Sequence, residues 1–291
     1  MIAVTHFSDP GCPWAYSAAP FMSVLAWRYG DQLAWRHVMI GLTEQAAQYD
    51  ARGYRPVSGA LGYLRRFRPL GMPFDTTPRP RNMATGLACR AVVATRLLEA
   101  PRELAAFRAL QLARFTDTVV FDEPEGIRRA LARVEGLDAG AVVAALGSEE
   151  TEAAYQEDRA LARTAAGSPT EFQGRSAATD GPVRYTAPSL IFRADDGRTL
   201  EAGGFQHLDA YDVLIANLDP TLERRPPAED AADVLAAFAY PLTTREVAAV
   251  IAPHLTEPDD VAAEASLVEA VARGAARRET VGGGALWHAT A

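Results

Sequence analysis

The order of apolar and polar residues near the N-terminus predicts a strand, a helix and a second strand in succession. Residues 2–7 alternate as a half-buried strand does, and residues 18–29 have helical spacing. Residues 33–41 are rich in β-forming side chains and predict a second strand. Because a helix joins the two strands, we expect a right-handed βαβ unit in which the strands are parallel.

Between residues 43 and 178 the pattern changes to helices. Apolar side chains recur at helical spacing, and Asp122, Asp138 and Ser148 are suited to cap helix starts. We expect this block to form one all-helical insertion. The predicted helices cover residues 54–68, 81–99, 101–118, 123–134, 138–146 and 149–166.

Strand patterns return after the helical block. The elements predicted there are a loop over 172–184, a strand over 185–192, a turn at 195–197, a strand over 198–202 and a helix over 208–218. Pro188 lies near the start of the first of these strands. Because proline cannot donate a backbone hydrogen bond, its place before an apolar run needs an explanation, of which a trans proline at a strand entrance is one.

The composition shifts again after Pro220. Residues 220–230 are polar and contain prolines, which predicts a linker. The pattern beyond the linker resembles a small winged-helix module. It predicts a capped helix start at 242–246, a helix over 259–273 and a hairpin over 276–289. Residues 221–291 contain six arginines and eleven acidic side chains, a net charge of −5, which argues against DNA binding. We expect this module to pack against the main domain or to form a dimer contact.

Composition limits the classes of partner. The 291-residue chain has a net charge of −8, so it would repel a nucleic acid or an anionic membrane, which carry negative charge themselves. All 29 of its basic residues are arginine. Neither a signal-like segment after Met1 nor an apolar run of about 18 residues is found. We therefore expect a cytoplasmic protein that binds neither nucleic acid nor membrane.

Cys12 is the first candidate for chemistry. It lies between the first predicted strand and helix, and Pro13 fits the first turn of that helix. The N-terminus of a helix favours a thiolate, and a cysteine there can have a pKa of roughly 3.5 to 7.5 instead of about 8.5. We expect Cys12 to be ionised, and the alternative is a buried structural cysteine.

Two further side chains have a plainer explanation. Cys89 lies inside a predicted helix among apolar residues, which indicates core packing, and the rival hypothesis is that it resolves disulfides formed at Cys12. His37 lies in the second predicted strand, where a core or edge histidine is expected in preference to a catalytic base. Neither metal-ligand spacing nor a phosphate-binding glycine motif is found.

The residues around Cys12 resemble a known family. A strand followed by cysteine and proline at a helix start is similar to the thioredoxin superfamily, and Ser-Asp-Pro-Gly-Cys-Pro-Trp over 8–14 resembles its DsbA-like branch, including FrnE-type cytoplasmic proteins. The resemblance implies an α/β thioredoxin-like fold with an all-helical insertion and, here, a small winged-helix-like appendage. The implied boundaries are 1–42 with 183–219 for the thioredoxin-like domain, 43–182 for the insertion, 220–230 for the linker and 231–291 for the C-terminal domain.

The family resemblance also implies residue roles. Thioredoxin-fold proteins hold a cis-proline opposite the active cysteine, and Thr186, Ala187 and Pro188 stand where that substrate platform is carried. Trp14 is expected to shield the sulfur. Three further side chains precede the expected cis-proline and are candidates to face Cys12: Glu171, Arg184 and Tyr185. The ordinary polarity of a loop explains the presence of these residues equally well.

The sequence departs from the family at one position. Ala15 stands where the second cysteine of Cys-Pro-Trp-Cys is expected. The site is therefore predicted to contain one reactive thiol, and the protein to be a monothiol thiol-disulfide oxidoreductase. In this reaction Cys12 attacks a disulfide of a small molecule or a protein. An external thiol such as glutathione, mycothiol or bacillithiol, or a protein cysteine, then resolves the mixed disulfide.

Two alternatives stay open at this point. The first is an enzyme like the kappa-type glutathione transferases or 2-hydroxychromene-2-carboxylate isomerases, which use a low-molecular-weight thiol. The second is a binding or scaffold module whose site has decayed. We expect neither a tightly bound cofactor nor a metal in any of these cases, and a homodimer is left open.

Overall fold

The computed structural model describes residues 1–290 and begins with the predicted βαβ unit. Strand β1 (Ile2–Ser8) is followed by α1 (Pro13–Ser17), α2 (Ala19–Tyr29) and β2 (Leu33–Met39). The strands β1 and β2 are parallel, with Ile2 opposite Leu33 and Ser8 opposite Met39. The second strand ends two residues earlier than the sequence predicts.

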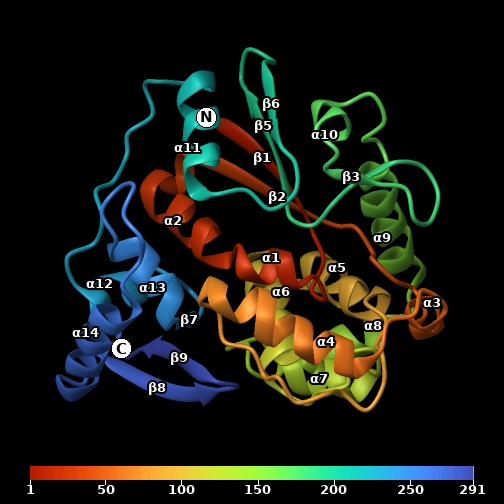
Figure 1. Cartoon of the computed structure of the whole chain (residues 1–291), viewed down its shortest axis with the longest axis horizontal. Coiled ribbons are helices and arrows are strands. Elements are labelled where there is room, and N and C mark those ends of the chain that lie inside the picture. The colour runs from red at the N-terminus through yellow and green to blue at the C-terminus, as the bar shows by residue number, and fades with distance from the viewer. Residues whose placement is uncertain (291) are drawn as a thin grey trace.

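The central sheet has four strands in the order β2-β1-β5-β6 (Figure 1). Strands β5 (Ser189–Ala194) and β6 (Thr199–Ala202) are antiparallel to their neighbours, and α11 (Leu208–Leu218) follows them. Helices α2 and α11 cover one face of the sheet. Their apolar side chains form a buried core with those of the strands, which includes Ile2, Val4, Leu25, Leu190, Phe192 and Ile215.

A helical part is inserted between β2 and β5. It contains α3 (Ala46–Ala51), α4 (Pro56–Gly62), α5 (Gly86–Glu99), α6 (Glu103–Thr116), α7 (Pro124–Leu131), α8 (Ala139–Ala145), α9 (Glu149–Ala162) and α10 (Pro169–Phe172). Asp138 and Ser148 cap α8 and α9 as predicted. Asp122 does not cap a helix; its carboxylate binds Arg81 and the backbone N–H of Ala84.

Two predicted helices in the insertion are shorter or less regular than expected. The segment 54–68 becomes the short helix α4, a π-turn over Tyr63–Phe67 and a 3₁₀ turn over Arg68–Leu70. Pro56 fixes the start of α4, and Pro69 lacks the N–H that a continuing helix would need. Helix α5 begins at Gly86 and not at 81, because Asp122 holds the preceding residues in a loop.

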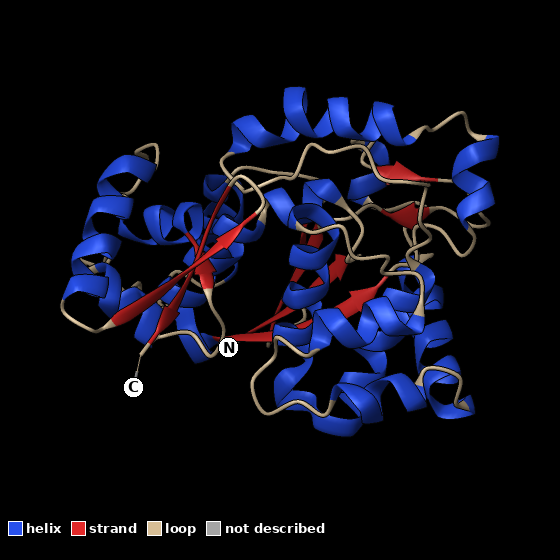
Figure 2. Ribbon diagram, turned by 90° about the horizontal axis from the view of Figure 1, so that it is seen from below, coloured by secondary structure: helices blue, strands red, loops and turns tan. Residues whose placement is uncertain are grey.

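Helices α5 and α9 of the helical part pack against β2 at the free edge of the sheet. Figure 2 shows the red strands lying among the blue helices. Strand β2 is an edge strand, so one row of its backbone groups has no strand partner. Asp158 of α9 accepts a hydrogen bond from the N–H of Met39 (2.9 Å), and Arg96 of α5 donates to the carbonyl of His37 (2.8 Å). Arg96 and Asp158 also pair with each other at 2.9 Å, so one ion pair binds two of the backbone groups on this edge.

The predicted strand over 185–192 is divided in two. Strand β4 (Arg184–Tyr185) pairs with β3 (Ser176–Ala177), and β5 begins only at Ser189. A cis peptide bond between Ala187 and Pro188 separates them. The short strand β3 lies in the predicted loop over 172–184, within the block that we expect to contain no strand.

The C-terminal part has the element order of a winged helix. It consists of α12 (Ala231–Ala236), β7 (Leu242–Thr243), α13 (Thr244–Ile251), α14 (Asp260–Ala272), β8 (Ala276–Val281) and β9 (Gly284–Ala289), with strand order β7-β9-β8. Its core includes Val24 and Trp27 of α2, so this part packs against the main sheet's helix. Among residues 1–290, no helix combines the length and apolar content that crossing a membrane requires.

Candidate active site

Cys12 lies at the N-terminal cap of α1, directly after a tight turn. The N–H of Cys12 donates to the carbonyl of Asp9 (3.0 Å), and Pro13 occupies the first helical position. Gly11 permits the turn to approach α5, because a Cβ atom there would overlap the methyl group of Thr85. The predicted position of Cys12 at a helix start is therefore found in the structure.

The sulfur of Cys12 faces a backbone carbonyl from the other end of the fold. Its thiol donates to the carbonyl oxygen of Ala187 at 3.1 Å, and the Ala187-Pro188 bond is cis. The hydroxyl of Thr186 donates to the carbonyl of Arg175 (2.6 Å), and Ser189 donates to the carbonyl of Thr186 (2.6 Å). The structure thus brings Cys12, Ala187 and Pro188 together, and Thr186 fixes the platform through its own hydrogen bonds.

Burial determines the protonation state of Cys12. Only 6% of the residue is exposed, and Phe7, Ala162 and Tyr185 belong to the apolar cluster around it. Burial raises the pKa of the Cys12 thiol to about 12; the N–H of Ala15 lowers it, and the charge of Asp9 raises it further. The expectation of an ionised Cys12 is therefore wrong for this arrangement, because desolvation outweighs the helix N-terminus.

Asp9 connects the cysteine turn to the helical part. Its buried carboxylate accepts from the N–H groups of Gly11 (2.7 Å) and Leu42 (2.8 Å) and from the hydroxyl of Thr85 (2.8 Å). Burial raises the pKa of this carboxyl group, while these hydrogen bonds lower it. The sequence analysis did not single out Asp9, although an acidic side chain three residues before the candidate cysteine was a usable signal.

Cys89 is a second buried thiol beside the same carboxylate. Its Sγ donates to Asp9 Oδ2 at 3.4 Å, it is fully buried in the core of the helical part, and burial raises its pKa well above the ordinary value. Both cysteines are free thiols. The prediction of core packing for Cys89 agrees with this placement.

The residues before the platform differ in their relation to the sulfur. Arg184 is buried, and its positive charge is one of the influences that lower the pKa of Cys12. Tyr185 stacks on Phe7 with ring centroids 4.5 Å apart. Glu171 accepts a hydrogen bond from the N–H of Gly167 (2.6 Å) in the loop before α10, which matches the plainer reading of a polar loop residue.

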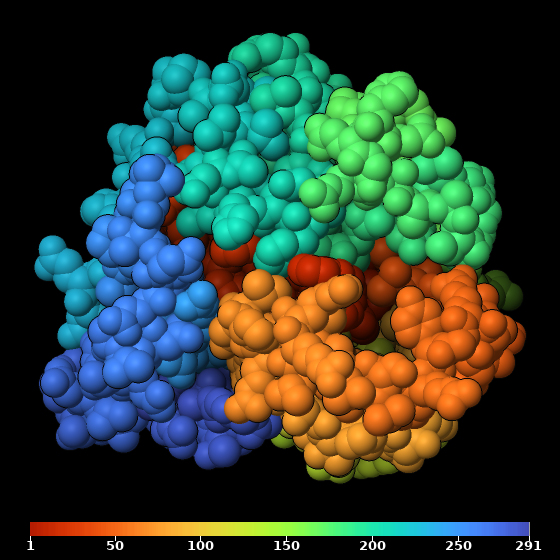
Figure 3. All heavy atoms as spheres, in the orientation of Figure 1, coloured from red at the N-terminus to blue at the C-terminus, as the bar shows by residue number. Residues whose placement is uncertain are grey.

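Trp14 and Ala15 face different surroundings. The ring of Trp14 packs against Phe67 (4.8 Å between centroids) and Phe205 (5.2 Å), with the guanidinium of Arg66 at 6.0 Å. In the space-filling view, red N-terminal residues are visible at the centre of this face, between the orange and teal segments (Figure 3). Ala15, by contrast, lines a small cavity between α2, α6 and the strands β1 and β2.

His37 is a core histidine, in agreement with the sequence-based preference. Its Nδ1 lies 3.3 Å from Nδ1 of His6, and burial lowers the pKa of His37 to about 4 and that of His6 to about 3. In the part of the chain that the structure describes, no three His, Cys, Asp or Glu side chains gather closely enough to hold a metal ion.

Comparison with known proteins places this geometry among related folds. A family model described as a DSBA-like thioredoxin domain matches residues 3–185. A putative protein disulfide isomerase from Nitrosomonas europaea has 16% identity and a TM-score of 0.55, with 74% of this chain and 96% of that chain covered. A probable DsbA oxidoreductase from Streptomyces coelicolor has 19% identity and a TM-score of 0.52, with 79% and 93% covered.

A third solved structure is similar at the same level. The cytosolic disulfide reductase DsbM from Pseudomonas aeruginosa has 20% identity and a TM-score of 0.50, with 76% of this chain and 98% of that chain covered. At these identities the likeness concerns the fold. A search of curated protein sequences found no match.

Proposed function

Because the chain belongs to the family of DSBA-like thioredoxin domains, we propose that it catalyses thiol-disulfide exchange with Cys12 as its nucleophile. The observation that carries this proposal is the 3.1 Å contact between Cys12 Sγ and the carbonyl of Ala187. It places one sulfur at a helix start, opposite a backbone segment that an extended substrate can pair with. Pro13 and Trp14 shape the thiol side of the site, and Thr186, Ala187 and Pro188 form the substrate side.

The proposed reaction has two exchange steps. The Cys12 thiol loses its proton, and the thiolate attacks one sulfur of a substrate disulfide; a bond forms between the two sulfurs, and the other substrate sulfur leaves as a thiolate that takes up a proton. A second thiolate, from an external thiol, then attacks the mixed disulfide and releases Cys12. These two steps convert the substrate disulfide into one free thiol and one mixed disulfide with the external thiol. A second external thiolate then attacks that mixed disulfide, which releases the remaining substrate thiol and joins the two external thiols as a disulfide.

Deprotonation requires that the resting arrangement opens. In the closed site the thiol proton is held by the Ala187 carbonyl, and the apolar cluster disfavours a charged sulfur. A substrate N–H that takes this carbonyl as its acceptor would remove that partner from the thiol. The N–H groups of Ala15 and Trp14, which lower the pKa of Cys12, would remain to stabilise the thiolate.

The second step needs a thiol from outside the chain. Position 15 is alanine, and Cys89 is fully buried with its hydrogen bond directed to Asp9. A low-molecular-weight thiol such as glutathione, mycothiol or bacillithiol, or a cysteine of another protein, is therefore the proposed co-substrate. Such thiols are abundant in the cytoplasm, which is the proposed compartment.

One observation favours a second candidate function. A buried thiol with a raised pKa is typical of an inert cysteine, so the chain could be a binding module whose catalytic site has decayed. The two candidates differ in whether Cys12 ever forms a mixed disulfide. In the transferase-like alternative, a small thiol bound to the protein reacts with an electrophile, and no disulfide forms on the protein.

Turnover with matched cysteine variants tests the proposal. Reduction of 2-hydroxyethyl disulfide by glutathione would be measured with the wild type, Cys12→Ser and Cys89→Ser. We expect Cys12→Ser to lose the acceleration and Cys89→Ser, once shown to be folded, to keep it. Equal rates for wild type and Cys12→Ser would contradict the proposal and favour the binding module, and conjugation of glutathione to an aromatic halide without disulfide turnover would favour the transferase.

A further inference from the structure

A small, partly open cavity adjoins Ala15, three residues after Cys12. Its volume is about 140 Å³. Strands β1 and β2, helices α2 and α6 and the loop before β7 all contribute to its wall. The lining is largely aromatic and aliphatic and includes Ala15, Trp35, Phe107 and Tyr240. Such a space accepts a small apolar molecule if its polar wall atoms are also satisfied.

Three buried polar atoms on the lining residues have no hydrogen-bond partner among residues 1–290. They are His6 Nε2, Gln111 Nε2 and Arg108 Nε. His6 is 4% exposed and Gln111 is 2% exposed, so neither side chain is solvated from outside. Gln111 Nε2 and Arg108 Nε are donors, whereas His6 Nε2 donates or accepts according to its tautomer. Because buried donors are nearly always satisfied in folded proteins, the two unpartnered donors indicate that an acceptor atom occupies the space.

The charges around the cavity indicate a neutral occupant. Arg108 is paired with Glu246 at 2.7 Å, so its charge is already compensated. The His6 and His37 rings are neutral near pH 7, since burial lowers the pKa of each well below its ordinary value. A buried carboxylate would thus find no free cation, whereas a carbonyl oxygen would find the amide N–H groups of Gln111.

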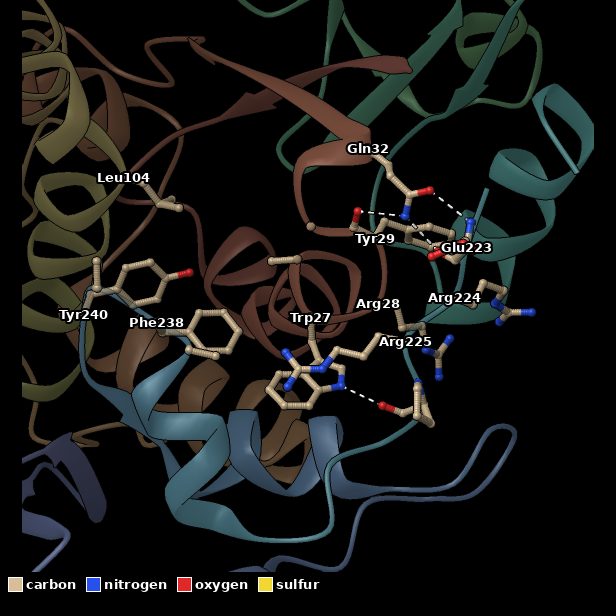
Figure 4. Close-up of a pocket in the computed structure, with 15 residues that line it drawn as sticks. Trp27, Arg28, Tyr29, Gln32, Leu104, Glu223, Arg224, Arg225, Phe238 and Tyr240 are labelled. Atoms are coloured by element: carbon tan, nitrogen blue, oxygen red, sulfur yellow. Dashed lines mark hydrogen bonds between the residues drawn. The ribbon is translucent and has the colours of Figure 1, made fainter. Parts of the chain in front are cut away.

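The cavity adjoins a larger cleft of about 740 Å³. The two spaces share Ala26, Leu104 and Tyr240 in their walls. Figure 4 shows Phe238 and Tyr240 on one side of this cleft and Trp27 with Arg225 across from them. The Arg225 guanidinium carbon lies 3.3 Å from the centre of the Trp27 ring, so the entrance is also lined by flat groups.

We propose that this cavity binds a neutral molecule with one aromatic ring and one carbonyl oxygen, which enters past Tyr240. The size fits a single ring, because an engineered apolar cavity of about 150 Å³ in another protein binds benzene. Phe107, Trp35 and Tyr240 supply aromatic walls for the ring, and Gln111 donates to the carbonyl oxygen. The proposal does not rest on the reactivity of Cys12.

Two probe molecules of nearly equal shape test the proposal by calorimetry. Acetophenone carries a ring and a carbonyl group, and ethylbenzene replaces the carbonyl by a methylene. We expect one acetophenone to bind per chain, about tenfold tighter than ethylbenzene because of one added hydrogen bond. The His6 ring signals in NMR spectra should shift on binding, and Cys12→Ser should bind equally well, which separates this result from the exchange assay.

Substitutions in the wall provide the controls. Gln111→Met should reduce acetophenone binding to the ethylbenzene level and leave ethylbenzene binding unchanged, whereas Gln156→Met on the exposed side of α9 should change neither. Ala26→Leu, which fills the shared entrance, should weaken both probes and serves as the second test if Gln111→Met does not fold. Failure of acetophenone to bind the wild type, or equal binding of both probes, would overturn the proposal and leave a cavity that holds water alone.

Discussion

Opposing influences decide the charge of Cys12 at the scale of single residues. Burial and the carboxylate of Asp9 favour the thiol, and the N–H groups of Ala15 and Trp14 together with Arg184 favour the thiolate. Burial prevails, and the pKa moves from 9.0 to about 12. Three pH units correspond to roughly a thousandfold less thiolate at neutral pH, so exchange at Cys12 needs the site to open first.

The two charged neighbours of Cys12 predict opposite effects on its reactivity. Removing the negative charge with Asp9→Asn should lower the pKa of Cys12 and raise its alkylation rate at pH 8, by about fivefold. Removing the positive charge with Arg184→Gln should slow alkylation by a similar factor. Iodoacetamide labelling followed by mass spectrometry of the Cys12 peptide measures both rates. Asp31→Asn, on the exposed turn before β2, is the matched control, and changes of equal sign in the two test variants would refute this account of the pKa.

At the scale of elements, the segment from α4 to the 3₁₀ turn packs against α1, the helix that begins directly after Cys12. Its Phe67 packs against Trp14, the residue that follows Cys12 and Pro13 in the active turn. Because Phe67 is itself buried, this contact holds Trp14 in place as part of an apolar cluster with Phe74 and Phe115. Loosening the contact should expose the sulfur more often without altering any charge near it.

Phe67→Leu should therefore increase both the alkylation rate and the disulfide exchange rate of Cys12, by about threefold to tenfold. The physical reason is a lower free-energy cost of opening, of about 1 kcal/mol, once part of the ring contact is lost. Phe172→Leu is the matched control, because that ring is 82% exposed. Unchanged labelling of Cys12 in Phe67→Leu, with normal folding, would show that this segment does not gate the site.

The sequence predicted well those helices and strands whose ends depend on neighbouring residues in the chain. The helix over 208–218 and the two strands of the C-terminal hairpin were predicted well, because turn and apolar periodicity are local properties. The start of α5 was not, since it depends on Asp122 from a distant loop. The burial of Cys12 could not be predicted either, because Ala162 and Tyr185, which surround it, come from far along the chain.

At the scale of the whole molecule, one buried ion pair joins the three parts of the chain. Glu246 of α13 pairs with Arg108 of α6 at 2.7 Å and accepts from the hydroxyl of Ser23 in α2. Glu246 is fully buried and also completes the capping box with Thr243 at the start of α13. The charge of Arg108 is therefore compensated only while the helical and C-terminal parts stay together, and Ser23 adds a hydrogen bond from α2 to the same carboxylate.

Glu246→Gln should destabilise the protein by about 3 kcal/mol or more, because it leaves the buried Arg108 without its counter-charge. Urea unfolding followed by circular dichroism measures the change. Glu125→Gln removes a comparable pair with Arg128 on the exposed face of α7 and should have no measurable effect. Equal midpoints for wild type and Glu246→Gln would contradict the joining role.

The raised pKa of Cys12 predicts a pH dependence of stability. The folded protein holds this proton more tightly than the unfolded chain, so its stabilising contribution is complete below pH 9 and is lost as the pH rises from 9 towards 12. Between pH 9 and 10.5 the free energy of unfolding of the wild type should fall by about 2 kcal/mol more than that of Cys12→Ser. Parallel curves for the two proteins would show that the Cys12 pKa is not raised.

The central claim is that the buried Cys12 thiol opens to form a mixed disulfide and is then released by an external thiol. Mass spectrometry of the protein after incubation with oxidised glutathione tests it most directly. The account predicts one glutathionyl group on the Cys12 peptide, none on the Cys89 peptide, and complete loss of the adduct when reduced glutathione is added. An unmodified Cys12 after prolonged incubation of the folded protein would contradict it.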